Sequence, residues 1–201
     1  MPASSAALAT GSHMTIDQAL NRPDRKNYEL IDGVLTNRMG TVWSAYIAAQ
    51  FVGHLTRYGR QYGGYALTGG FPLALWPDRE HLLRPAMSFF KPDQIAGRIN
   101  GDDEYTRIVP ALVIEVVPAA AADYPIAARI TDYRGARVPL LWVVRLDRGV
   151  AEVRESGGAV STVGFDAELT GGTVLPGCSC PLQDLIPEWM WPGAYPRPSE
   201  P

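Results

Sequence analysis

Two apolar runs, residues 111–117 and 140–146, lie on either side of a segment with a helical pattern, residues 123–136. Each run has the length of a buried strand and falls far short of the roughly 20 residues that a helix needs to span a membrane. Strands that alternate with helices pack as a sheet with helices against it. We therefore expect an α/β fold around one mixed sheet.

A helix and a hairpin are expected before this region. The dipeptide Asp32-Gly33 is a strong hairpin signal between two strand-like segments, 28–31 and 34–38. Apolar residues recur every three or four positions over 42–58, which predicts an amphipathic helix. Those residues are Trp43, Ile47, Phe51, Leu55 and Tyr58, and a Gly-Gly pair at 63–64 ends the helix. Further strands are expected at about 65–76, 84–90, 150–155, 159–165 and 173–180.

The chain length of 201 residues suits a single domain, expected over 14–186, with a disordered tail at 1–13 and a tail rich in proline and tryptophan at 187–201. The first residues lack the basic and apolar segments of a secretory signal. Cys178 and Cys180 are the only cysteines, and their spacing suits buried thiols better than a disulfide or a metal pair. We expect a cytoplasmic protein.

The chain is slightly acidic overall, and arginine far outnumbers lysine among its basic residues. The chain has 18 basic and 21 acidic residues, so its net charge of −3 argues against a strongly electrostatic nucleic-acid binder, although a local basic surface remains open. Only Lys26 and Lys91 are lysines, and every other basic residue is arginine. Chemistry that needs a lysine in the second half of the chain is therefore excluded.

Glu115 is the most informative single residue, because it interrupts an apolar run of six residues. A lone carboxylate is costly to bury in a sheet, so it needs a partner, a metal ion or a cleft. A carboxylate near the end of a central strand is a common element of a hydrolytic metal site. An exposed edge position, or pairing with an arginine, explains Glu115 equally well.

Other candidate groups are weaker. Glu29 shares one face of its strand with Ile31 and would by itself be read as a solvated position. His13, His54 and His81 show no metal-ligand spacing and are expected to be surface or hydrogen-bonded histidines. The chain has no Gly-x-Ser-x-Gly element and no phosphate-binding glycine loop, so neither a serine hydrolase nor a nucleotide-binding fold of that kind is supported.

Several segments nevertheless follow one another in a recognisable order. They are Tyr-Glu-Leu-Ile-Asp-Gly at 28–33, Arg-Pro-Ala at 84–86, Pro-Ala-Leu-Val-Ile-Glu-Val-Val at 110–117, Tyr133 with the strand 138–144, and Leu-Pro-Gly at 175–177 followed by Leu185. Their order and spacing, over about 14–186, resemble the Uma-two endonuclease family of the PD-(D/E)XK superfamily. The resemblance implies a restriction-endonuclease-like single domain with a central mixed sheet flanked by helices.

The resemblance also implies a function. Family members would hydrolyse DNA phosphodiesters with Mg²⁺, which is held by carboxylates and activates a water. Here Glu115 and Glu29 would be the catalytic acids, with Glu115 as metal ligand, and Arg129 would contact the phosphate. A homodimer is expected, and no membrane association.

The chain departs from the family pattern at the chemical positions. The metal-binding aspartate maps to Ala86, and the catalytic lysine on the helix maps to Arg129. Asp123 could compensate by reaching back from the start of its helix, and Lys91 is the sole candidate for a migrated lysine. We therefore expect weak Mg²⁺ binding and an impaired or absent nuclease activity.

Three functions follow from these observations. The first is a Mg²⁺-dependent endonuclease, and the second is a pseudoenzyme that binds DNA on a nuclease fold. The third is a homodimeric interaction protein that uses the apolar 140–146 region or the tryptophan-bearing tail. The missing aspartate and lysine favour the second and third.

Overall fold

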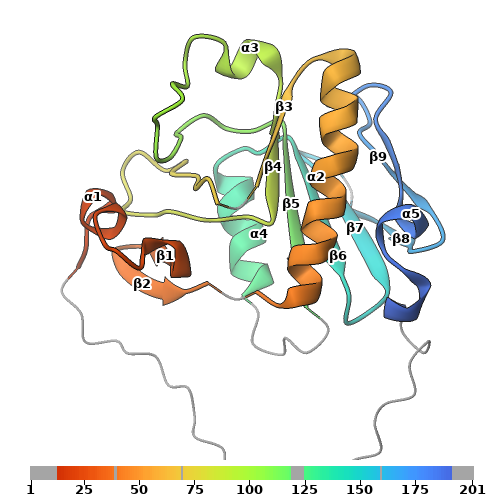
Figure 1. The fold of residues 1–201 in the computed structure, drawn as a ribbon, viewed down its shortest axis with the longest axis horizontal. Helices are drawn as coiled ribbons and strands as arrows, with labels where there is room; N and C mark the ends of the chain where they lie inside the picture. Colours follow the sequence, from red (N-terminus) through yellow and green to blue (C-terminus); the bar gives the residue numbers. More distant parts are fainter. Residues whose placement is uncertain (1–12, 39, 69, 119–124, 159, 192–201) are drawn as a thin grey trace, which may run out of the picture.

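The computed structural model describes residues 13–38, 40–68, 70–118, 125–158 and 160–191. A six-stranded sheet in the order β3-β4-β5-β6-β7-β8 forms its centre (Figure 1). The strands are β3 Tyr65–Thr68, β4 Met87–Phe90, β5 Leu112–Val117, β6 Leu140–Arg145, β7 Val150–Glu155 and β8 Val160–Gly164. The pairing of β5 with β6 is parallel and the other four pairings are antiparallel. The expected α/β fold around a mixed sheet is confirmed.

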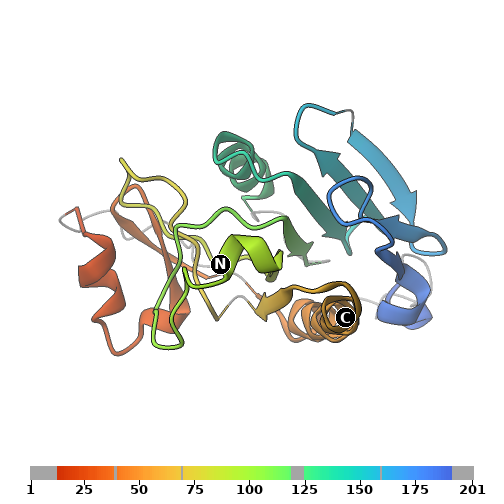
Figure 2. The same cartoon turned by 90° about the horizontal axis from the view of Figure 1, so that it is seen from above.

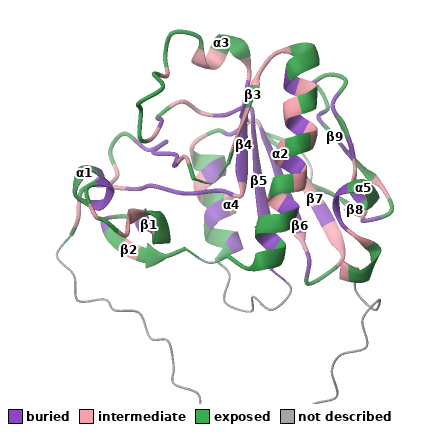
Figure 3. Ribbon diagram, viewed as in Figure 1, coloured by how far each residue is buried: buried purple, intermediate pink, exposed green. Residues whose placement is uncertain are grey.

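Helices cover both faces of this sheet. The long helix α2 (Val42–Tyr62) lies on one face together with α5 (Leu182–Leu185), and α4 (Ile126–Gly135) lies on the other (Figure 2). Because α4 connects two parallel neighbours, β5 and β6, it crosses back over the sheet as such connections must. Both faces of β5 are therefore covered, and all six of its residues are buried (Figure 3).

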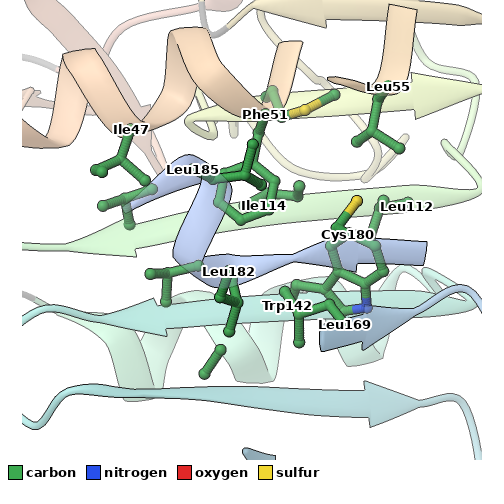
Figure 4. Close-up of a cluster of buried hydrophobic side chains, with 14 of the residues drawn as sticks. Ile47, Phe51, Leu55, Leu112, Ile114, Trp142, Leu169, Cys180, Leu182 and Leu185 are labelled. Carbon is green, nitrogen blue, oxygen red and sulfur yellow. The ribbon is translucent and has the colours of Figure 1, made fainter. Parts of the chain in front are cut away.

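Alternate residues of β5 belong to different cores, since successive side chains of a strand point to opposite faces. Leu112, Ile114 and Val116 pack with residues of α2 and α5. Figure 4 shows this core, in which Ile47, Phe51, Leu55, Trp142, Leu169, Cys180, Leu182 and Leu185 also take part. Val113 and Val117 pack instead with Ile126 and Tyr133 of α4. Glu115 therefore belongs to the α4 face of the sheet.

A smaller unit is formed near the N-terminus by β1 (Tyr28–Ile31), β2 (Val34–Asn37) and α1 (Ile16–Leu20). The connecting residues Asp32 and Gly33 have φ angles of 49° and 80°, as the hairpin turn expected at this dipeptide requires. Backbone hydrogen bonds in both directions between Leu30 and Leu82 fasten β1 to the segment that leads into β4. This contact brings β1 toward the central sheet.

Helix α2 begins with a capping box in which the side chains of Thr41 and Ser44 each accept a hydrogen bond from the other's backbone N–H. The helix continues four residues beyond the expected 42–58, and Gly63, with φ 84°, ends it as expected. Tyr62, four residues after Tyr58, continues the same spacing as far as this end.

Several sequence-based boundaries were wrong. Residues 71–76 and 84–86 are not strands, and only an isolated bridge joins Leu73 to Leu83. The strand expected at 173–180 is replaced by a short pair, β9 (Glu168–Thr170) and β10 (Ser179–Pro181). A turn at Pro176-Gly177, where Gly177 has φ 75°, interrupts that segment. The short helices α3 (Pro92–Ile95) and α5 and the 3-10 turns 25–27 and 188–190 were not predicted.

Cys178 and Cys180 are buried free thiols, as expected from their spacing. The C-terminal segment docks through Trp191, whose Nε1–H donates to the carbonyl of Ile186 at 3.0 Å. The tail expected at 1–13 falls outside the described residues except for His13, and so do residues 192–201. Within the described ranges, no helix has the length and apolar character needed to cross a bilayer.

Candidate functional site

The carboxylate of Glu115 is paired with a guanidinium from the helix that covers it. Arg129, on the buried side of α4, donates from Nε at 2.9 Å and from Nη2 at 2.7 Å to Oε1 of Glu115. Glu115 is 1% exposed and Arg129 is 5% exposed. Of the explanations open from the sequence, pairing with an arginine is the one that the structure shows.

Glu29 reaches the same guanidinium from a different part of the chain. Nη1 of Arg129 donates to Oε2 of Glu29 at 2.5 Å, across 100 residues of sequence. The other oxygen of Glu29, Oε1, accepts the backbone N–H of Arg84 at 2.5 Å. Glu29 is 6% exposed, so it is not the solvated strand position that its local pattern indicated. Arg129 thus bridges the two carboxylates that the sequence singled out.

Tyr133 is the fourth side chain of the cluster. From the sequence it is recognised only as part of the family pattern at the end of the helix, and no functional role is predicted for it. It lies one helical turn after Arg129, on the same face of α4. Its hydroxyl donates to Oε1 of Glu115 at 2.6 Å and accepts from Nη2 of Arg129 at 3.3 Å. Burial, against the opposing effect of Arg129, raises the pKa of Tyr133 well above its usual value. The phenol therefore stays protonated and acts as a donor.

A second buried arginine, Arg84, stands beside this cluster. Its guanidinium donates to the carbonyl oxygens of Tyr28 at 3.1 Å, Gly70 at 2.9 Å and Arg25 at 3.4 Å. Burial lowers the pKa of Arg84, and the neighbouring cation Arg38 lowers it further. Arginine nevertheless stays charged in proteins, so Arg84 adds a second positive charge next to two negative ones.

The position expected to carry a metal-binding aspartate is Ala86. Ala86 directly precedes Met87, the residue of β4 that pairs with Ile114 of β5. It packs against the core on the α2 face of the sheet, whereas Glu115 belongs to the α4 face. A methyl group offers no ligand atom. Among the described residues, no group of three or more histidine, cysteine, aspartate or glutamate side chains could hold a metal ion. The residues that the structure describes here therefore do not fit the divalent cation that the family resemblance implies.

Two candidate compensating residues have different outcomes. The start of β4 pairs near Glu115, since Met87 lies beside Ile114, and β4 then runs away from it, with Phe89 beside Leu112. Lys91 follows the end of β4 and therefore lies away from Glu115. Asp123 falls outside the described residues.

An open groove of about 600 Å³ lies next to this cluster, at the beginning of α2. Lys26, Arg38 and Arg84 line it together with Ala86 and Val116, and none of its described lining residues is acidic. The other lining residues are Asn27, Asn37, Gly40, Thr41, Val42, Ser44, Ala45 and Ala48. The N-terminus of a long helix adds partial positive charge at the same place. The groove is therefore locally cationic on a chain that is acidic overall.

A smaller cavity of about 220 Å³ adjoins the groove on the α4 side. It shares Asn37, Arg38 and Arg84 with the groove, and Glu29 and Arg129 line it as well. The buried ionic cluster and the cationic groove are thus two sides of one region. Arg84 connects them.

A second cluster of charged side chains joins the turn between β1 and β2 to α4. Arg79 donates from Nε at 2.6 Å to Asp32 and from Nη1 at 3.0 Å to Asp132. His81 is fully buried between the same two carboxylates, at 3.3 Å from Asp32 and 3.4 Å from Asp132. Its place in a polar loop of the sequence did not reveal this burial. The hydrogen bond from Arg79 is the main cause that lowers the pKa of Asp32 to about 2.

The fold of this chain is shared with a protein of known structure. A crystal structure described as "a putative nuclease belonging to DUF820", from Anabaena variabilis, superposes with a TM-score of 0.72 at 18% sequence identity. The superposition covers 88% of this chain and 99% of that one, which shows a common fold. Among curated proteins, none matches the chain significantly. The sequence model of the Uma2 family, described as "Putative restriction endonuclease", matches residues 16–183, and the chain therefore belongs to this family.

Proposed function

We propose that this protein binds DNA through the cationic groove on its nuclease fold and does not hydrolyse it. The observation that carries the proposal is the position of Arg129, which bridges Glu29 and Glu115. A metal-dependent nuclease needs carboxylates that are accessible to a metal ion, whereas in this chain the guanidinium of Arg129 occupies the position between them.

The charge balance supports this reading. Two carboxylates, Glu29 and Glu115, are paired with the guanidinium of Arg129, and Glu29 also accepts the backbone N–H of Arg84. The guanidinium of Arg84 lies nearby, so the formal charges of the four side chains cancel. Mg²⁺ requires near-octahedral oxygen ligands and gives up its waters reluctantly. To bind here, it would have to displace Arg129 and leave that guanidinium uncompensated in a buried site, which is strongly unfavourable.

The protons of the cluster point to the same conclusion. A guanidinium remains protonated in proteins, so Arg129 cannot accept a proton from an attacking water. The hydroxyl of Tyr133 is held as a donor by Glu115. Oε1 of Glu115, one of the two carboxylate oxygens that could act as a base, already accepts hydrogen bonds from Arg129 and Tyr133.

DNA binding is supported by the groove itself. Lys26 and Arg38 are exposed residues that line the groove, and residues from the first turn of α2 line it as well. Phosphate contacts from such residues position a backbone without reading its sequence. The net charge of −3 predicts that binding depends on this local surface and weakens steeply with salt.

A cleavage assay tests the proposal. Supercoiled plasmid is incubated with purified protein and Mg²⁺ or Mn²⁺, beside the variants Glu115→Ala and Glu115→Gln. We expect no nicking above the level of either variant. Robust cutting that both variants abolish would overturn the proposal and establish a Mg²⁺- or Mn²⁺-dependent endonuclease.

A further inference from the structure

Large apolar side chains gather on the surface at the start of α2. Trp43 is 47% exposed, Tyr46 39% and Trp189 41%. The ring of Trp43 meets that of Trp189 at 4.6 Å between centroids and 70° between planes, and that of Tyr46 at 6.4 Å and 83°. We call these three residues the aromatic platform. Edge contacts of this kind hold rings in place while leaving part of their area open to a ligand.

The fold itself does not need Trp43 in its core. The spacing of apolar residues in the sequence places Trp43 in the same stripe as Ile47, Phe51 and Leu55, yet those three are fully buried and Trp43 is half exposed. Clustered apolar surface on a folded chain is a mark of a binding site, whereas scattered exposed residues are not. The platform thus indicates a ligand with flat apolar surfaces.

The platform adjoins the cationic groove. Val42, which lines the groove and is 78% exposed, directly precedes Trp43 in the first turn of α2. Tyr46 lies one helical turn further on, about 6 Å along the axis. A nucleic-acid strand whose phosphates lie in the groove can therefore extend its bases across the first turn of α2 to the platform.

The combination of charges and rings selects one class of ligand. Positively charged grooves with adjacent aromatic rings suit unpaired nucleic acid, because phosphates contact the cations while bases stack on the rings. The bases of an intact duplex are already stacked and paired, so they cannot reach such rings. We infer that the aromatic platform stacks the bases of a single-stranded DNA segment whose backbone lies in the groove. This inference rests on the DNA binding proposed above.

Fluorescence anisotropy with three labelled probes of equal length tests the inference. The probes are an oligothymidylate, a single strand of the same backbone with abasic sites, and a duplex. We expect the native protein to bind the oligothymidylate most tightly. Trp43→Ser and Tyr46→Ser should each weaken that binding at least about fivefold, in line with the loss of one stacked base, and leave the abasic strand and the duplex unchanged.

A control variant and two further measurements make the result specific. Tyr65→Ser removes a comparably exposed aromatic ring, 55% exposed on β3, and should change nothing. The tryptophan fluorescence of the native protein should be quenched by the oligothymidylate and less so in Trp43→Ser, a signal that a merely structural role would not give. Circular dichroism melts check that each variant is folded.

Each outcome has a clear meaning. If the native protein binds abasic strand and oligothymidylate equally, or if Tyr65→Ser weakens binding as much as Trp43→Ser, the platform inference is overturned. DNA binding as such survives in that case if Lys26→Ala and Arg38→Ala weaken all three probes. Absence of binding to every probe overturns both. A dimer in sedimentation experiments that Trp43→Ser dissociates would assign the platform to a second copy of the chain and overturn the inference.

Discussion

Arg129 donates two hydrogen bonds to a single atom, Oε1 of Glu115, from Nε at 2.9 Å and from Nη2 at 2.7 Å. The side chains of the two residues are 6% and 1% exposed. A buried pair of this kind is held together because separating it would leave each charge unsolvated in the interior. The pair explains how a carboxylate can stand in a fully buried strand.

Removing the guanidinium should therefore destabilise the fold. In Arg129→Ala, Glu29 and Glu115 are left buried without their shared cation, and we expect a loss of about 3–5 kcal/mol in the free energy of unfolding. Urea denaturation measures it. Arg57→Ala, an exposed arginine of α2, is the matched control and should stay within about 0.5 kcal/mol of the native protein. A loss below about 1 kcal/mol in Arg129→Ala would mean that the cluster does not hold the fold.

The second ionic cluster gives a prediction for acid conditions. The pKa of Asp32 is lowered from 3.8 to about 2, chiefly by the hydrogen bond from Arg79. A carboxyl group with a lowered folded pKa stabilises the fold above its unfolded pKa, and this contribution is lost as the pH falls through the folded value. Asp32→Asn, which tolerates the same turn conformation, should thus be less stable than the native protein at neutral pH.

The difference between these two proteins should shrink as the pH falls from about 4 to about 2. Thermal denaturation of both, followed over that range, measures the difference. A gap in stability that stays constant over this range would show that Asp32 does not contribute through its charge.

Salt dependence tests which cations contact DNA. Each phosphate contact that is lost should reduce the slope of log K against log salt by about 1, so Lys26→Ala and Arg38→Ala should each give a shallower slope. Arg57→Ala, near the other end of α2, should leave the slope unchanged. Equal effects of all three substitutions would place DNA binding elsewhere or show that it is diffuse.

The periodicities of the sequence predict the elements that frame the site. Apolar alternation and turn residues locate the β1–β2 hairpin, α2 and the β5–α4–β6 unit, because these depend on local patterns. The segment 173–180 was misread, since its apolar residues surround a turn at Gly177 and do not alternate along one strand. Short helices such as α5 have too few residues for a period to be visible.

The sequence predicts most of the residues that form the site, but it does not predict which of them contact one another. The importance of Glu115 and the helix position of Arg129 both follow from the sequence, whereas the sequence left open whether Glu115 is buried or lies at an exposed edge. Their joining with Glu29 does not, because that contact spans 100 residues and depends on how β1 docks beside Arg84. Helical spacing likewise puts Trp43 in the core, and only the packing of the C-terminal segment shows that its ring lies at the surface against Trp189.

The central claim is that the guanidinium of Arg129 and the methyl group of Ala86 together remove the metal site. It is tested most directly by titrating Mg²⁺ into the native protein and into the double variant Ala86→Asp/Arg129→Lys in a calorimeter. Circular dichroism confirms that the variant is folded. We expect no binding heat from the native protein and measurable Mg²⁺ binding by the variant. Mg²⁺ binding by the native protein that Glu115→Gln abolishes, or a variant that binds no better than the native protein, would contradict the account.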